Sequence, residues 1–226
     1  MIFSLTPRLE NIASHVTGAT AADIGTDHAY VPIELVREGR CTYVIASDIK
    51  PGPAAIAREN VKKYMCADRI EVRTGPGLSV IDIGETEDII IAGMGGILIR
   101  DIIAADIEKA KAARLVLQPM NSQYELRHYL IENGFNITEE DISVEGFKVY
   151  NLITAEKGSG TPFENDGLYH LPPYLAEHEY FDRLYAKKMR ELDRVIDGIR
   201  TASSPDIDKL NKYQKWKQEI SEFFSK

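Results

Sequence analysis

Apolar residues in the first two thirds of the chain follow two alternating spacings. Short runs of consecutive apolar residues, typical of buried parallel strands, alternate with stretches whose apolar residues recur every three or four positions, typical of amphipathic helices. The first spacing predicts strands at residues 21–24, 43–47, 70–73, 89–92 and 115–118, and the second predicts helices at residues 7–17, 31–37, 53–64, 97–105 and 124–132. This alternation indicates a parallel sheet with helices on both faces.

The pattern changes near residue 135. Two strand-like runs, residues 136–144 and 148–155, are joined by the short segment Glu145-Gly146-Phe147. So short a connection permits only an antiparallel hairpin. A mostly parallel sheet that ends in an antiparallel hairpin is the usual layout of class I Rossmann-like methyltransferase domains rather than of a simple NAD domain. We therefore expect an α/β fold of that class.

The last third of the chain predicts a small helical part. Residues 157–173 contain three glycines and three prolines and indicate a linker, whereas residues 174–200 and 205–224 have helical spacing and are separated by Ser203-Ser204-Pro205. Two long helices with a short break predict a C-terminal α-helical hairpin. We expect a methyltransferase domain at residues 1–157, a linker at residues 158–173 and the helical hairpin at residues 174–226, with a donor site that does not depend on the hairpin.

Composition narrows the class of protein. A hydrophobic fraction of 44% and a charged fraction of 27% exclude a disordered chain, and no apolar run is long enough to cross a bilayer. The two cysteines, Cys41 and Cys66, lack metal-ligand spacing. We expect a cytoplasmic protein without metal. The net charge of −8 argues against a nucleic-acid partner, but residues 174–226 hold 11 basic and 10 acidic residues, so local patches could still bind one.

The first predicted strand runs into a loop rich in carboxylates. Asp23, Gly25 and Asp27 lie between this strand and the next helix, where backbone N–H groups can bind a small molecule. An anionic pyrophosphate would be repelled by the two carboxylates, whereas the ammonium and sulfonium of S-adenosylmethionine would be attracted. The charge pattern favours a methyl donor over NAD. The alternative is that Gly25 only makes a tight turn and Asp27 only caps the helix.

The next loops give weaker signals at the same edge of the sheet. Asp48 ends the second strand, where a carboxylate can bind ribose hydroxyls, or it caps the following helix. The segment Gly75-Pro76-Gly77 can lie against an adenine ring or form an ordinary turn. Three glycines around Met94, at Gly93, Gly95 and Gly96, allow a ligand to approach the backbone closely.

Polar residues follow the fifth strand. Gln118 and Asn121 can hydrogen-bond a base edge or the donor, or they can form a polar cap before the helix that follows. His28 could act as a general base, although a lone loop histidine is more often structural. The other histidines show no ligand spacing.

Together these loops resemble one family, the bacterial tRNA adenine-N1 methyltransferases of the TrmK type. The resemblance covers nearly the whole chain and is carried by the segments Asp23-Ile24-Gly25-Thr26-Asp27-His28-Ala29-Tyr30, Ile91-Ala92-Gly93-Met94-Gly95-Gly96 and Leu117-Gln118-Pro119. It implies S-adenosylmethionine as donor, adenine-22 of tRNA as acceptor and a hairpin that contacts tRNA. One position departs from the family: Pro76 stands where an acidic residue is expected, so the donor adenine must be recognised by the backbone or by another residue.

Methyl transfer to adenine N1 needs little acid–base chemistry. The N1 lone pair is free to attack, so catalysis rests mostly on positioning. Positive charge moves onto the base, and Asp27 is the candidate carboxylate that stabilises it. The target adenine must be unpaired or pulled from its stack. Tyr30 or Met94 would pack against it, and we group Gly95, Gln118 and Asn121 with Tyr30 as substrate-binding residues.

A basic stripe on the first C-terminal helix is the candidate contact with tRNA phosphates. Positions 183, 187, 190 and 194 are spaced by four, three and four residues and share one helix face. We expect Lys187 and Arg190 to face outward and bind phosphates; the alternative is a solvated helix face. Two other functions stay open, an NAD-dependent oxidoreductase on the same fold and a non-catalytic donor-binding module.

Overall fold

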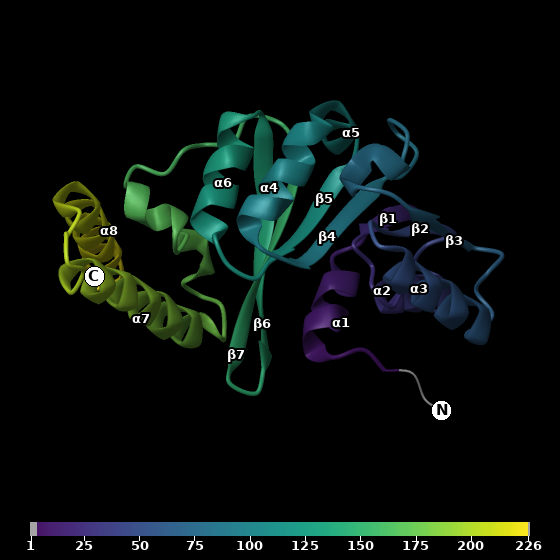
Figure 1. Cartoon of the computed structure of the whole chain (residues 1–226), viewed down its shortest axis with the longest axis horizontal. Coiled ribbons are helices and arrows are strands. Elements are labelled where there is room, and N and C mark those ends of the chain that lie inside the picture. Colours follow the sequence, from purple (N-terminus) through teal and green to yellow (C-terminus); the bar gives the residue numbers. More distant parts are fainter. Residues whose placement is uncertain (1–3, 226) are drawn as a thin grey trace.

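A twisted sheet of seven strands forms the centre of the protein (Figure 1), in a computed structural model that describes residues 4–225. The strand order is β3-β2-β1-β4-β5-β7-β6, with β1 to β5 parallel and β6 and β7 antiparallel to their neighbours. The bounds are β1 Thr20–Ile24, β2 Tyr43–Asp48, β3 Ile70–Thr74, β4 Asp88–Met94, β5 Arg114–Pro119, β6 Phe135–Glu145 and β7 Lys148–Lys157. The predicted fold class is confirmed.

Helices cover both faces of this sheet. One buried cluster joins it to α1 (Pro7–Ser14), α2 (Tyr30–Arg37) and α3 (Pro51–Lys63). A second cluster on the opposite face involves α4 (Gly96–Ala105), α5 (Ile107–Lys111) and α6 (Gln123–Glu132). The long apolar runs of the strands follow from this arrangement, because a parallel strand between two helical layers is buried on both sides.

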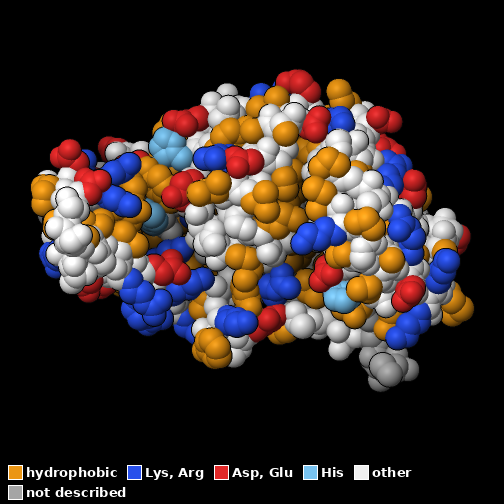
Figure 2. Space-filling view, viewed as in Figure 1, with side chains coloured by type: hydrophobic (Ala, Val, Ile, Leu, Met, Phe, Trp, Pro, Cys, Tyr) orange, Lys and Arg blue, Asp and Glu red, His pale blue; other side chains and the backbone are white. Residues whose placement is uncertain are grey.

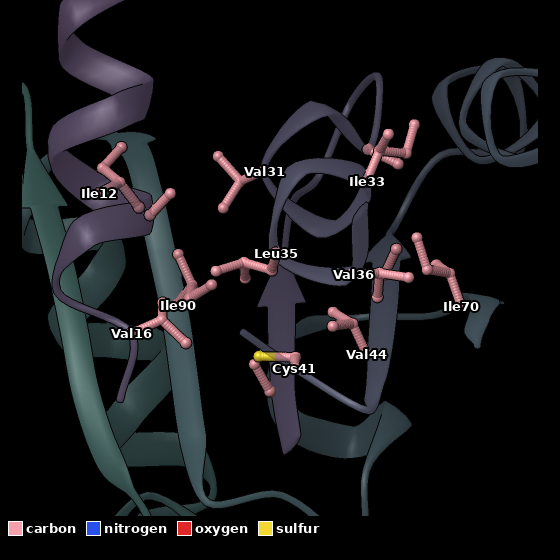
Figure 3. Packing of buried hydrophobic residues seen from close by; sticks show 14 of the residues in the cluster. Ile12, Val16, Val31, Ile33, Leu35, Val36, Cys41, Val44, Ile70 and Ile90 are labelled. Atoms are coloured by element: carbon pink, nitrogen blue, oxygen red, sulfur yellow. The ribbon is translucent and has the colours of Figure 1, made fainter. Parts of the chain in front are cut away.

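The first cluster fixes the start of the loop after β1. Figure 3 shows Val31 and Leu35 of α2 pointing toward Ile12 of α1 and Ile90 of β4. All four side chains are at most 5% exposed. This packing joins α1 and α2 on one face of the sheet, so the loop between β1 and α2 leads into a helix that is anchored in the core.

The C-terminal helices α7 (Phe181–Arg200) and α8 (Ile207–Phe224) share a core with the sheet. Leu184 and Leu192 of α7 and Ile220 of α8 lie in one buried cluster with Ile142 of β6 and Val149 of β7. Removing residues 174–226 would expose this cluster, and the independence of the donor site from the hairpin stays a prediction. Single substitutions are the cleaner test of what the hairpin does.

The segment expected as a linker is a packed part of the structure. It contains two short 3₁₀ helices, at Asp166–Tyr169 and Pro173–Leu175, and buries Leu168, Tyr169 and Leu171. The first C-terminal helix begins at Phe181 rather than at residue 174. Before it, the Tyr174 hydroxyl donates a hydrogen bond of 2.6 Å to the buried Glu140 of β6, which connects this segment to the sheet. Within residues 4–225, no helix is long and apolar enough to cross a membrane.

Candidate active site

The loop after β1 makes a sharp turn over the carboxyl edge of the sheet. Gly25 has φ of +80°, and its N–H and that of Thr26 both donate to the Ser47 carbonyl of β2 at 2.8 Å. A Cβ at Gly25 would lie 2.1 Å from the terminal methyl of Met94. The backbone angle favours glycine, and a side chain at position 25 would also force the flexible end of Met94 to move.

Asp23 is a buried carboxylate at the base of this loop. It is 6% exposed and accepts a hydrogen bond of 2.6 Å from the Thr26 hydroxyl. The pKa of Asp23 is raised to about 6, mainly because burial disfavours the charged form. The hydrogen bond from Thr26 lowers this pKa, and the negative charge of Asp48 raises it. Within residues 4–225, no basic side chain lies within ion-pair distance of Asp23. A cationic ligand would supply the missing partner.

Arg8 of α1 brings a positive charge to the same place. Its guanidinium donates to the side-chain oxygen of Gln118 at 3.1 Å and lies 5.6 Å from the ring centre of Tyr150. Its backbone N–H donates to Glu145 at the end of β6. Sequence reasoning missed Arg8, because its partners are 110 and 137 residues away along the chain. The one available signal was a basic residue in the first turn of a helix, where cations are normally disfavoured.

A cavity of about 270 Å³ lies between α1, the β1 loop and the end of β4. It brings together several of the predicted site residues and Arg8. Its lining comprises Arg8, Leu9, Asp23, Gly25, Thr26, Asp27, His28, Tyr30, Val31, Ala92 and Gly93. A negative group (Asp23) and a positive group (Arg8) therefore line one small cavity, which suits a zwitterionic ligand such as an amino acid moiety.

Asp27 lies at the mouth of this cavity and does not cap a helix. The residue at the N-cap of α2 is Ala29, and no side chain caps it. The Asp27 side chain is 64% exposed and lies 3.4 Å from Nε2 of His28, whose ring stacks on that of Tyr30. Asp27 has φ of +50°, a left-handed angle that aspartate and asparagine adopt more readily than most residues. The alternative that Asp27 caps this helix is thus wrong, and its role in catalysis stays a prediction.

The loops after β2 and β3 are connected to each other. The Asp48 carboxylate accepts the N–H of Lys50 at 2.8 Å, so it stabilises a turn and does not cap α3, whose N-cap is Lys50. The Asp48 carbonyl accepts the N–H of Gly75 at 3.1 Å. Pro76 is exposed, and its carbonyl accepts hydrogen bonds from Ser79 in the short helix that begins at Gly77.

The glycines after β4 allow close contact with the loop after β5. A Cβ at Gly95 would lie 3.0 Å from Oδ1 of Asn121, and one at Gly96 would lie 2.4 Å from the Ser122 carbonyl. The Gly96 N–H donates to the Asn121 carbonyl at 3.0 Å. Asn121 is exposed at this edge and is available to a substrate.

Gln118, for which a base edge, the donor and a polar cap were the alternatives, is enclosed by the protein. It is 1% exposed, and its oxygen accepts from Arg8 and from the N–H of Gly93 at 3.2 Å. Its amide nitrogen lies 3.6 Å from the sulfur of Met120. A side chain so enclosed positions its neighbours rather than contacting a base directly.

The basic stripe on α7 faces the β6–β7 hairpin and is only partly free. The Lys187 ammonium donates to the Val149 carbonyl at 2.7 Å, and the Arg183 guanidinium donates to the Gly146 carbonyl at 2.5 Å. The helix periodicity identified the shared face correctly, but it did not reveal that part of this face packs on β7. Arg190 is exposed.

Comparisons with known proteins show which family the chain resembles. The sequence matches the family of methyltransferase domains over residues 5–153. It is 32% identical to the tRNA (adenine(22)-N(1))-methyltransferase of Bacillus subtilis, with 91% of this chain and 90% of that protein covered. The crystal structure of the B. subtilis M1A22 tRNA methyltransferase TrmK superposes with a TM-score of 0.86 at 30% identity, covering 98% of this chain and 99% of that one.

A further relative was solved with a ligand. The structure of a putative tRNA (m1A22) methyltransferase of Streptococcus pneumoniae in complex with S-adenosyl-L-methionine gives a TM-score of 0.84 at 31% identity, covering 97% of this chain and 99% of that one. The fold and the site define a Rossmann-like methyltransferase. Within that class, the chain belongs to the family of tRNA (adenine(22)-N(1))-methyltransferases.

Proposed function

We propose that this protein transfers a methyl group from S-adenosylmethionine to N1 of adenine-22 in tRNA. The observation that carries the proposal is the buried Asp23 carboxylate without a basic partner, opposite Arg8 in one cavity. This pair fits the ammonium and the carboxylate of the donor's amino acid moiety. The full-length similarity to the B. subtilis enzyme supports tRNA as the acceptor. An NAD-dependent oxidoreductase would bring a pyrophosphate against these carboxylates, so the charge pattern disfavours it.

S-Adenosylmethionine, when bound, supplies the methyl group. Asp23 would hold its ammonium, Arg8 its carboxylate and Asp48 a ribose hydroxyl, while Gly25, Gly93 and Met94 line the wall beside it. The exposed loop of Gly75, Pro76 and Gly77 has no acidic side chain, so backbone groups of this loop would contact the donor adenine. Gln118 orients Arg8 by accepting its hydrogen bond.

The substrate adenine would enter at the exposed edge of the cavity. Tyr30 would stack on the base, and Asn121 beside Gly95 would hydrogen-bond its edge. The Asp27 carboxylate would accept a hydrogen bond from the exocyclic amine and stabilise the positive charge that develops on the ring as N1 is methylated. No general base is required, because N1 attacks with a free lone pair. His28 accordingly has a structural role, through its contacts with Asp27 and Tyr30.

We expect S-adenosylhomocysteine to bind and its affinity to depend on the protonation of Asp23. The raised pKa of about 6 means that Asp23 is ionised at pH 7.5 and mostly protonated at pH 5. A protonated Asp23 no longer attracts the ligand's ammonium, so titration calorimetry should show an affinity about tenfold weaker at pH 5 than at pH 7.5. Asp23→Asn should bind weakly at both pH values, and NAD should not bind. An affinity for S-adenosylhomocysteine that is equal at both pH values would contradict the assignment of Asp23.

A further inference from the structure

The tip of the β6–β7 hairpin and α7 form a groove of about 270 Å³ beside the candidate active site. Its lining is basic and aromatic and comprises Met120, Phe147, Lys148, Val149, Tyr150, Lys187, Arg190, Glu191 and Arg194. Figure 2 shows Lys and Arg side chains gathered beside the hairpin tip and along the near side of α7. This concentration of positive charge occurs in a protein whose net charge is −8.

Several cations of the groove are not neutralised by the protein. Glu191 lies 3.0 Å from the buried Lys188 and 3.9 Å from Lys187, so its charge is already balanced. Across residues 4–225, no carboxylate lies within ion-pair distance of Lys148, Arg190 or Arg194. Exposed cations that line one groove without a carboxylate partner favour binding of a polyanion.

Phe147 is the most unusual residue of the groove. It stands at the turn between β6 and β7 and is 88% exposed, the highest exposure among the large hydrophobic side chains of the described chain. The turn that carries it is not loose, since the Gly146 carbonyl accepts a hydrogen bond from Arg183 and Lys187 binds the next strand at Val149. An exposed ring on an anchored turn, among cations, is the arrangement on which unpaired bases stack.

The groove leads directly to the site where chemistry is expected. Met120 lines the groove, and its N–H donates at 2.8 Å to the carbonyl of Met94, which follows Gly93 of the cavity that contains Asp23 and Arg8 (the donor cavity). Tyr150 also lines the groove, and its ring contacts Arg8 of the donor cavity. A strand lying in the groove would therefore place a neighbouring nucleotide at the active-site edge.

We propose that this groove binds an unpaired segment of the RNA substrate next to the target adenine, with a base stacked on Phe147 and phosphates on Lys148, Arg190 and Arg194. The proposal rests on the proposed function, because it takes tRNA as the substrate. It assigns the β6–β7 tip, and not only α7, to RNA recognition. Stacking on an aromatic ring tolerates any base, whereas the phosphate contacts set the salt dependence.

The test measures binding of an unmodified tRNA transcript to the full chain at several salt concentrations. Phe147→Ala should weaken binding on the order of tenfold without changing the slope of log affinity against log salt, because stacking is not ionic. Phe147→Tyr should retain the affinity. Arg190→Gln should reduce the slope by about 0.7 to 0.9, as expected for one lost phosphate contact. Met65→Ala, at an 85% exposed apolar residue between α3 and β3, is the matched control and should bind like the wild type.

Two results would overturn the inference. One is tRNA binding by Phe147→Ala as tight as by the wild type. The other combines two measurements: the wild type self-associates in sedimentation and the Phe147→Ala variant does not, while both bind RNA with the same affinity. Phe147 would then be a contact between copies of the chain. Failure of the proposed function has a different signature, since the wild type would then leave tRNA unmethylated whatever residue 147 is.

Discussion

Replacing Asp27 with asparagine should lower the rate of tRNA methylation at saturating donor by on the order of 100-fold or more. The substitution keeps the size of the side chain and suits the left-handed backbone angle at this position, but it removes the charge. Loss of one electrostatic contact to a transition state typically costs this much. Single-turnover measurement of methyl transfer to a tRNA transcript gives the rate directly.

Asp23→Asn is the matched control for this experiment. It removes a carboxylate from the same loop, but one that we assign to the donor's ammonium, so it should weaken S-adenosylhomocysteine binding more than it lowers the saturated rate. The Asp27→Asn variant should show the opposite pattern, with a large fall in the saturated rate and a small change in S-adenosylhomocysteine binding. Near-normal turnover in Asp27→Asn would remove Asp27 from the chemistry and leave positioning alone as the source of catalysis.

Replacing Arg127 with methionine should destabilise the fold by about 3 to 5 kcal/mol, because it leaves a buried carboxylate without its partner. Arg127 is 0% exposed, donates to both oxygens of Glu140 at 2.7 and 2.6 Å, and donates to the Tyr169 carbonyl at 2.8 Å. It thus joins α6, β6 and the segment that precedes α7. For a chain of this size, the loss corresponds to a melting temperature lower by about 10 °C.

The double variant Arg127→Met with Glu140→Leu distinguishes the loss of the ion pair from the cost of leaving one buried charge unpaired. Removing both charges avoids an unpaired buried carboxylate, so the double variant should be clearly more stable than Arg127→Met alone. Thermal unfolding of the three proteins under the same conditions measures this difference. A single variant that melts within 2 to 3 °C of the wild type, a change worth only about 1 kcal/mol, would show that the ion pair does not hold this region together.

The layered sheet was predictable from the sequence for a physical reason. Strands such as β1 and β4 are buried on both faces, so each is a short and mostly apolar run that differs plainly from the three-to-four spacing of the helices. The location of the candidate site followed as well, because parallel strands bring the loops at their carboxyl ends to one edge. The sequence therefore predicted that Gly93, after the fourth strand, lies near Asp23 and Gly25, and all three line one cavity.

Features that depend on distant contacts could not be predicted in this way. The role of Arg8 depends on Gln118, which lies 110 residues away. The spacing of Lys187 defines a helix face but not the strand that packs against it. Glycines and prolines in residues 157–173 suggested a linker, whereas Leu168 and Tyr169 are buried there by elements on either side. Local pattern gives the faces of an element, and only tertiary contacts decide what covers each face.

The most direct test of the account is mass spectrometry of nucleosides from a tRNA transcript incubated with the full chain and S-adenosylmethionine. We predict that 1-methyladenosine forms, and that it does not form in a transcript whose adenine-22 is replaced by guanosine. A reaction that methylates a different nucleoside, or that leaves the transcript unchanged although S-adenosylhomocysteine binds the protein, would contradict the proposed function.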